Sequence, residues 1–357
     1  MSALNSHDSG AGIALPVDLR SDTVTRPTEQ MYEVMRTAPI GDDGLDFDPS
    51  VRLLEEGVAT LLGKEEGLFV PSCTMANLLA VLAQTGRGEQ VVLESSAHMY
   101  TSERGAATFT GLFYLGVPGL RGEMDLNHIE ESLKGGKHKL HTGVLAMETS
   151  HNNAGGAVPG LAHMQAVYRL AEAQGVPVHL DGARLFNAAV ALGVSAQSVA
   201  QHADTVSVCL SKGLSAPVGA VLVGPSAMMH QARRLRRMLG GTQRQAGIMA
   251  AAGRYGVQNM VSRLSEDHER AQHLSRLISQ LGLPISASQP QTNIVQIDIA
   301  QTGLDSSAWA NNLESLGLLV RPWGKDRLRC VTHRHIGDED IERAVACFKQ
   351  GVRLVAG

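Results

Sequence analysis

Short apolar runs alternate with amphipathic stretches along the chain from about residue 50 to residue 225. In the amphipathic stretches, apolar residues recur with the spacing of a helix that buries one face. The apolar runs are continuous, which is typical of strands in a parallel sheet that helices cover on both faces. We expect strands at 68–70, 90–94, 143–148, 176–181, 205–211 and 220–224, and helices at 51–63, 75–84, 161–174 and 185–192.

A second pattern follows the polar, amphipathic stretch at 255–281. It predicts a small α+β domain of about a hundred residues. Its expected elements are a strand at 293–299, a helix at 305–316, strands at 318–321 and 327–332, and a closing helix at 338–353. The predicted organisation is a disordered leader (1–15), a large α/β domain with a mostly parallel sheet (16–255) and a small C-terminal α+β domain (256–357).

Two ionisable residues follow predicted strands at one edge of the large sheet. Asp181 ends the strand at 176–181, and Lys212 comes just after the strand at 205–211. In a sheet of this kind, ligands bind beyond the carboxyl ends of the strands. We therefore expect both side chains to converge on one ligand site.

The surroundings of these two residues favour one kind of chemistry. Lys212 stands among small residues in CLSKGLSAPVG, and a desolvated amine of this kind is nucleophilic toward carbonyl groups. A strand-end aspartate can hold a protonated ring nitrogen by a charge-assisted hydrogen bond. Pyridoxal phosphate (PLP) requires both groups. An ion pair of Asp181 with Arg184 or Lys212 that only closes the strand ends explains the same spacing about equally well.

A third feature favours the cofactor. In FVPSCTMANLLA (69–80), Ser72, Cys73 and Thr74 stand at a predicted helix start, where N–H groups and hydroxyls form a site suited to a phosphate. Serine and threonine also cap helices that bind nothing. The turn therefore indicates a phosphate site only in combination with the strand-end aspartate and lysine.

Ordered motifs extend from Asp18 to the C-terminus. They are DLRSDTVTRPT (18–28), GDDGLDFDPSV (41–51), FVPSCTMANL (69–78), AHMYTSERGAA (97–107), METSHNNAGG (147–156), HLDGARLFNAAVALG (179–193), SVCLSKGLSAPVGAVL (207–222), LGGTQRQAGIMAAAG (239–253) and LRCVTHR (328–334). Through them the chain resembles the L-threonine aldolases, within the aromatic amino acid β-eliminating lyase/threonine aldolase group of fold-type-I PLP enzymes. The resemblance implies that fold and a PLP-dependent lyase that cleaves L-threonine, L-allo-threonine or related β-hydroxy-α-amino acids to glycine and an aldehyde.

The resemblance also implies roles around the cofactor. Lys212 would be the Schiff-base lysine, and Asp181 would pair with the pyridinium nitrogen. His98 would stack on the ring. The turn at Cys73 and Thr74 would hold the phosphate.

For the substrate, the resemblance implies that Ser21, Arg184 and Arg329 grip the carboxylate, with Arg184 also near the cofactor. Two arginines would thereby hold the Cα–Cβ bond perpendicular to the ring. His151 is a candidate for handling the β-hydroxyl proton, since a histidine suits that task at neutral pH. Arg244 would reach the phosphate of a neighbouring subunit, which implies at least a dimer, and a homotetramer built as a dimer of dimers.

Several positions depart from the usual pattern of these enzymes. Leu45 stands where tyrosine is common, Cys73 replaces a glycine, and Ser102 replaces an aromatic residue before Glu103. Thr242 and Gln243 replace a glycine and a methionine ahead of Arg244. The cofactor residues are intact, so these changes bear on substrate range. An apolar Leu45 is expected to favour bulkier substituents, such as the phenyl group of phenylserine.

Composition excludes some other functions. The 357 residues include 31 basic and 35 acidic ones, which gives no general reason to expect nucleic acid or a membrane as partner. The basic cluster at 232–241 is expected to solvate a helix face or to border a subunit contact. Four cysteines without metal-like spacing predict no metal site and reduced thiols in a cytoplasmic enzyme. A β-eliminating lyase and a catalytically silent scaffold stay open as alternatives.

Overall fold

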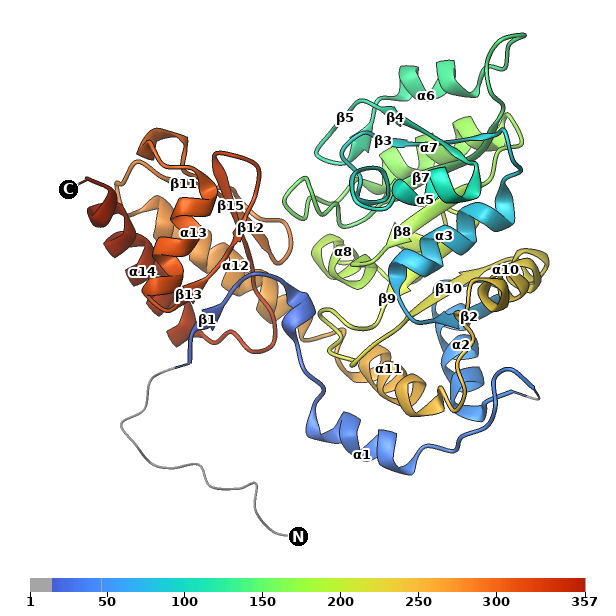
Figure 1. The fold of residues 1–357 in the computed structure, drawn as a ribbon, viewed down its shortest axis with the longest axis horizontal. Helices are drawn as coiled ribbons and strands as arrows, with labels where there is room; N and C mark the ends of the chain where they lie inside the picture. Colours follow the sequence, from blue (N-terminus) through green and yellow to red (C-terminus); the bar gives the residue numbers. More distant parts are fainter. Residues whose placement is uncertain (1–14, 46, 357) are drawn as a thin grey trace.

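The computed structural model describes residues 15–45 and 47–356. The leader predicted for residues 1–15 lies, apart from Leu15, outside the described residues. The chain forms a larger lobe around one sheet and a smaller lobe of mostly C-terminal elements (Figure 1). Within the described residues, no helix has the length and apolar character that crossing a membrane requires.

The larger lobe is built on a seven-stranded sheet. Every neighbouring pair is parallel except those of β10, which runs antiparallel to β2 and β9. The connection at 210–219 is too short for a helical crossover, so β10 must return beside β9 in the opposite direction. In spatial order the strands are β2 (Glu66–Val70), β10 (Ala220–Gly224), β9 (Thr205–Cys209), β8 (Val178–Gly182), β7 (Thr142–Glu148), β3 (Gln90–Glu94) and β4 (Phe113–Val117).

Helices cover both faces of this sheet, as the continuous apolar strands predict. In β10, Val221 and Val223 pack in one core with α2, α7 and α8, whereas Ala220 and Leu222 pack in another with α3 and α10. The helices of this lobe are α1 (Glu29–Thr37), α2 (Pro49–Leu62), α3 (Cys73–Gln84), α4 (His98–Thr101), α5 (Gly105–Thr110), α6 (Leu126–Leu133), α7 (Leu161–Glu172), α8 (Leu185–Leu192), α9 (Ala196–Ala200), α10 (Ser226–Met238) and α11 (Gly247–Asn259).

The smaller lobe contains a four-stranded antiparallel sheet in the order β11 (Ser286–Ala287), β12 (Ile294–Asp298), β15 (Arg327–Val331) and β14 (Arg321–Pro322). Its helices are α12 (Leu264–Ser279), α13 (Ser306–Ser315) and α14 (Asp338–Ala356), and Trp309 and Phe348 lie in its core. The division of the chain at residue 255 stays a prediction.

The N-terminal segment belongs spatially to this smaller lobe. Strand β1 (Val17–Asp18) pairs in parallel with β13 (Leu318–Leu319). Beyond β1, a short 3₁₀ helix at Asp22–Val24 leads the chain across to the larger lobe. The segment after β1 therefore bridges the two lobes. A separate two-stranded ribbon is formed by β5 (Gly119–Leu120) and β6 (Glu123–Met124).

One carboxylate joins three segments of the larger lobe. Asp48 Oδ1 accepts hydrogen bonds from the backbone N–H groups of Ser50 (2.9 Å) and Val51 (3.1 Å) and so caps α2. Its Oδ2 accepts from the N–H groups of Gly41 (3.0 Å) and Gly247 (2.9 Å). Asp48 is fully buried, so none of these groups has water as an alternative partner.

We expect Asp48→Ala to lower the free energy of unfolding by about 2–4 kcal/mol, because a lost cap adds to the cost of unpaired buried N–H groups. The control is Asp125→Ala: Asp125 caps α6 through the N–H of His128 (3.0 Å), and its side chain is partly exposed. That variant should lose only about 1 kcal/mol. Urea unfolding followed by circular dichroism measures both, and equal losses would contradict the joining role of Asp48.

Candidate active site

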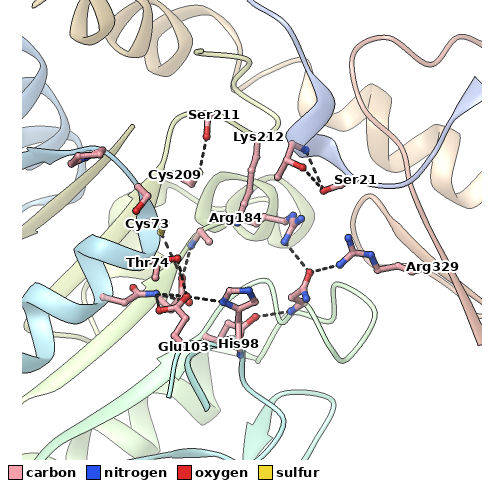
Figure 2. Close-up of a pocket in the computed structure, with 18 of the residues that line it drawn as sticks. Ser21, Cys73, Thr74, His98, Glu103, Arg184, Cys209, Ser211, Lys212 and Arg329 are labelled. Carbon is pink, nitrogen blue, oxygen red and sulfur yellow. Dashed lines mark hydrogen bonds and ion pairs between the residues drawn. The ribbon is translucent and has the colours of Figure 1, made fainter. Parts of the chain in front are cut away.

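A cavity of about 270 Å³ lies beyond the carboxyl ends of β8 and β9, and residues of both lobes line it (Figure 2). Its position agrees with the rule that ligands bind at the carboxyl ends of parallel strands. The structure brings most of the sequence-predicted site residues to this cavity: Ser21, Cys73, Thr74, His98, Asp181, Arg184, Lys212 and Arg329.

Asp181 lies at the end of β8 and is almost fully buried. Asn77 on α3 donates from Nδ2 to Asp181 Oδ2 at 3.0 Å. The amide is held in this orientation because its Oδ1 accepts from Ser207 Oγ (2.7 Å) and lies 3.1 Å from His179 Nε2. Burial, and then the negative charge of Glu103, raise the pKa of Asp181. A cationic partner in the cavity would therefore stabilise its ionised form.

His98 begins α4 and lies near Asp181 in the cavity wall. Its Nδ1 is 2.7 Å from Glu103 Oε1, and its backbone N–H donates to Glu148 Oε2 at 2.6 Å. The hydrogen bond to Glu103 raises the pKa of His98, and burial only partly opposes it. The ligand atoms of His98, Glu103 and Asp181 lie within 4.8 Å of one another, which is a possible cation cluster that the sequence did not predict.

The turn before α3 forms another part of the wall. Ser72 caps the helix through its side chain, and Cys73 and Thr74 occupy the first turn, whose N–H groups have no acceptor within the helix. Cys73 Sγ donates to Ser207 Oγ at 3.5 Å. Burial and the charge of Asp181 raise the pKa of the Cys73 thiol well above its usual value, so this thiol is neutral.

Arg184 is held by a buried carboxylate that follows β1. Its Nε and Nη2 donate to Asp22 Oδ2 and Oδ1, each at 2.7 Å, and both side chains are buried. Its remaining nitrogen, Nη1, donates to Asn152 Oδ1 at 3.3 Å. Asp22 therefore balances the charge of Arg184.

Arg329 differs from Arg184 because it lacks a counter-ion. Its Nη1 donates to Asn152 Oδ1 (2.9 Å) and its Nη2 to the carbonyl of Arg20 (3.1 Å). Among the residues that the structure describes, Nε has no hydrogen-bond partner and no acidic side chain pairs with the guanidinium. Burial, and then the charges of Arg184 and Arg321, lower the pKa of Arg329 to about 10. A buried cation of this kind is a site for an anionic ligand group.

Comparisons with known proteins identify the family. A model of the beta-eliminating lyase family matches residues 18–302. The chain is 39% identical to low-specificity L-threonine aldolase 1 of Arabidopsis thaliana, with 94% of this chain and 96% of that protein covered. It is 34% identical to the low specificity L-threonine aldolase of Escherichia coli K12, with 93% and 98% covered. The chain belongs to the beta-eliminating lyase family.

Solved structures show which fold the chain has. Threonine aldolase from Leishmania major superposes with a TM-score of 0.80 at 19% sequence identity, and the match covers 95% of this chain and all of that one. The likeness extends to an aspartate aminotransferase of Thermus thermophilus, with a TM-score of 0.73. These structures confirm the fold-type-I fold expected from the sequence, and the family model and the relatives confirm the family and the lyase class.

Three residues singled out in the sequence do not line the cavity. His151 is fully buried, with Nε2 3.2 Å from Glu94 Oε2 and 3.8 Å from Glu148 Oε2. Arg244 is largely exposed and donates to both oxygens of Asp42 at 2.8 Å. Leu45 is 77% exposed and lines a different hollow. The predicted roles of all three therefore stay predictions.

Sequence reasoning missed other residues that line or support the cavity, namely Asp22, Asn77, Glu148, Asn152 and Arg321. Asp22 lies inside the first family motif, and Asn152 directly follows His151, so their position in motifs was a usable signal. Arg321 lies outside every motif, and its place becomes visible only in the register of β14 with β15.

The pair of His98 and Glu103 gives a pH-dependent test. In Glu103→Gln the negative charge is lost, so we expect the raised pKa of His98 to fall, as measured by NMR titration of its imidazole. In the wild type, the pair's contribution to stability is present below the ordinary histidine pKa of 6.5 and is lost as pH rises through the raised folded value.

The variant should lose this part of the pH dependence of stability. The internal control is His179, since burial lowers its pKa to about 3 and its signal should not move between pH 5 and 9 in either protein. An unchanged pKa of His98 in Glu103→Gln would show that Glu103 does not hold the ring.

Proposed function

We propose that the protein is a PLP-dependent aldolase that cleaves L-threonine, L-allo-threonine or related β-hydroxy-α-amino acids to glycine and an aldehyde. The observation that carries the proposal is the convergence of Lys212, the buried Asp181 and the uncompensated Arg329 on one cavity. The names of the relatives from Arabidopsis thaliana and Escherichia coli support the same reaction.

The residues present fit the cofactor. The buried Asp181 carboxylate, held by Asn77, is positioned to accept from a protonated pyridine nitrogen. His98 would lie against the ring, and the N–H groups at Cys73 and Thr74 would hold the phosphate. We assign the cluster of His98, Glu103 and Asp181 to this ring and not to a metal ion. Lys212 would bind the cofactor covalently through Nζ.

The protein's own contribution begins with the substrate carboxylate. When bound, PLP supplies an electron sink for the negative charge that remains on Cα after the Cα–Cβ bond breaks. Arg329 would bind the carboxylate by charge, because it is buried and has no counter-ion. Arg184, fixed by Asp22, would contribute its Nη1 as a positioned donor, and Ser21 lies on the same wall. Two fixed contacts to one carboxylate orient the bond that breaks.

The β-hydroxyl proton needs an acceptor near the cavity. His98 and Glu148 line the cavity, whereas His151 lies behind Glu148. Burial alone would lower the pKa of His151, but the charges of Glu148 and Glu94 outweigh it and raise that pKa. A role for His151 in this step would therefore operate through Glu148, which faces the cavity.

The main alternative is a β-eliminating lyase that uses the same cofactor. The two reactions differ in their products, since the aldolase releases glycine and an aldehyde and the eliminating lyase releases ammonia and a keto acid. The catalytically silent scaffold is disfavoured because Lys212, Asp181 and Arg329 all line one cavity. We also propose a cytoplasmic location, because the four cysteines are free and a reducing compartment keeps them so.

Lys212→Ala should lose the visible absorbance of bound PLP and nearly all turnover of L-threonine, while its far-UV circular dichroism is retained. The absorbance and the release of glycine and acetaldehyde measure the two effects. Lys134→Ala is the matched control, since Lys134 is an exposed residue that pairs with Glu130, and neither residue lines the cavity. Near-normal turnover in Lys212→Ala would mean that another lysine carries the cofactor, and ammonia with a keto acid as products would favour the eliminating lyase.

We further propose that Arg244 completes the phosphate site of a neighbouring subunit, in a homotetramer built as a dimer of dimers. Arg244 does not line the cavity of its own chain, and its exposed guanidinium lies on the surface. A residue that serves the partner's site would be expected at such a position.

Mixed oligomers of Lys212→Ala and Arg244→Ala test this arrangement. Each variant alone should be nearly inactive, but a mixed pair contains one intact site, with lysine from one subunit and arginine from the other. Random mixing should therefore restore about a quarter of wild-type activity in a symmetric dimer. The activity of the unfractionated mixture of the two co-expressed variants is the measurement. Activity no higher than the mean of the two parents would place Arg244 in its own chain's site or outside any site.

A further inference from the structure

Two arginines face each other across the small sheet at the cavity. In the antiparallel pair of β14 and β15, Arg321 is the direct partner of Arg329. Like charges in directly opposite positions destabilise a sheet. Both side chains also line the same cavity, Arg329 in its buried wall and Arg321 at its exposed side.

Both guanidinium groups lie over the indole ring of Trp323. The Cζ atom of Arg329 lies 4.8 Å from the ring centroid, and that of Arg321 lies 5.5 Å from it. An aromatic face attracts a cation but adds no negative charge. Within the residues that the structure describes, neither arginine has an acidic partner, and no hydrogen bond is formed by the side chain of Arg321. The positive charge of Arg321 in fact lowers the pKa of Arg329.

The proposed function uses only one of these two charges. The α-carboxylate of an amino acid carries a single negative charge, which Arg329 balances while Arg184 is neutralised by Asp22. The positive charge of Arg321 at the cavity then remains unbalanced. The N–H groups of its planar guanidinium have no acceptor within the described residues, and their geometry matches a second carboxylate. The apolar side chain proposed to favour phenyl substituents, Leu45, does not line this cavity.

We propose that the enzyme accepts β-hydroxy-α-amino acids that carry a second carboxylate on Cβ, with Arg321 as the residue that recognises it. The simplest such substrate is 3-hydroxyaspartate. This inference rests on the proposed aldolase function and names a substrate class for it.

The reaction with this substrate balances without a co-reactant. The Cα–Cβ bond breaks, its electron pair stays on Cα, and Cα takes up one proton to give glycine. The β-hydroxyl loses its proton and becomes the carbonyl of glyoxylate. No atom is oxidised or reduced by an external agent, so the step is the threonine cleavage with a carboxylate in place of the methyl group.

The test compares two substrates in three proteins, each purified with its cofactor. We expect wild type to cleave both 3-hydroxyaspartate and L-threonine. Arg321→Gln should lower kcat/KM for 3-hydroxyaspartate by about 10- to 100-fold, the value of a charge-assisted hydrogen bond, and change that for L-threonine less than about twofold. Arg327→Gln is the matched control, because Arg327 is exposed on the same hairpin and does not line the cavity. It should leave both values unchanged.

The outcomes separate the two proposals. An equal fall in kcat/KM for both substrates in Arg321→Gln would assign Arg321 to the α-carboxylate and overturn the inference. Unchanged kcat/KM values for both substrates would overturn it too. If wild type cleaves neither substrate, the aldolase proposal fails. Calorimetry of L-aspartate binding then tests whether Arg321 binds a second carboxylate. Weaker binding of L-aspartate, but not of L-alanine, in Arg321→Gln would support the site. Equal binding of L-aspartate by both proteins would overturn it.

Discussion

The buried ion pair of Asp22 and Arg184 is the interaction on which the site depends. It joins the N-terminal bridging segment to the start of α8 through two hydrogen bonds of 2.7 Å. Asn293, from the smaller lobe, donates to the same carboxylate at 3.3 Å. Burial alone would raise the pKa of Asp22, but the charge and hydrogen bonds of Arg184 hold it well below its usual value. Removing either partner would leave a buried charge unbalanced, which costs far more than the pair itself contributes.

The ion pair of Asp22 and Arg184 also determines where positive and negative charges lie around the cavity. Because Arg184 is neutralised from within the protein and Lys212 is assigned to the cofactor, the positive charge offered to a substrate comes from Arg329 and Arg321 on the smaller lobe. The acidic groups that face the cavity, Asp181, Glu103 and Glu148, belong to the larger lobe. A molecule with a cationic ring at one end and carboxylates at the other matches this separation. The site is therefore polarised along the line that joins the two lobes.

The sequence predicted local elements well where burial is continuous. The helix expected at 185–192 and the strand expected at 220–224 have the same bounds in the structure. The edge strand β4 was missed although its sequence, FYLGV, is an apolar run. Unlike the central strands it is not buried throughout, since Phe113 and Leu115 are exposed. Strand β1 has only two residues, too few for any periodic signal.

The residues of the candidate site were predictable where they lie in recognisable sequence motifs. Eight of the ten proposed residues line the cavity, including Lys212 and Asp181, because strand ends fix their positions. The role of Asp22 was not predictable, since its partner lies 162 positions away and only the folded chain brings them together. The burial of His151 was missed for a similar reason: a short motif does not say which side of a loop faces the cavity.

The pairing of β1 with β13 has a consequence for how the protein forms. The segment that carries Ser21 and Asp22 is synthesised long before residues 319–331, but Leu19 donates to the carbonyl of Leu319 and accepts from the N–H of Val331. Contacts between residues so distant along the chain close late in folding, because a long loop must first be ordered. The larger lobe can collapse around its sheet while the ribosome still holds the C-terminal residues. Its substrate-binding wall is completed only after residues 318–331 are made, so a nascent chain that ends before them has the sheet before it has the site.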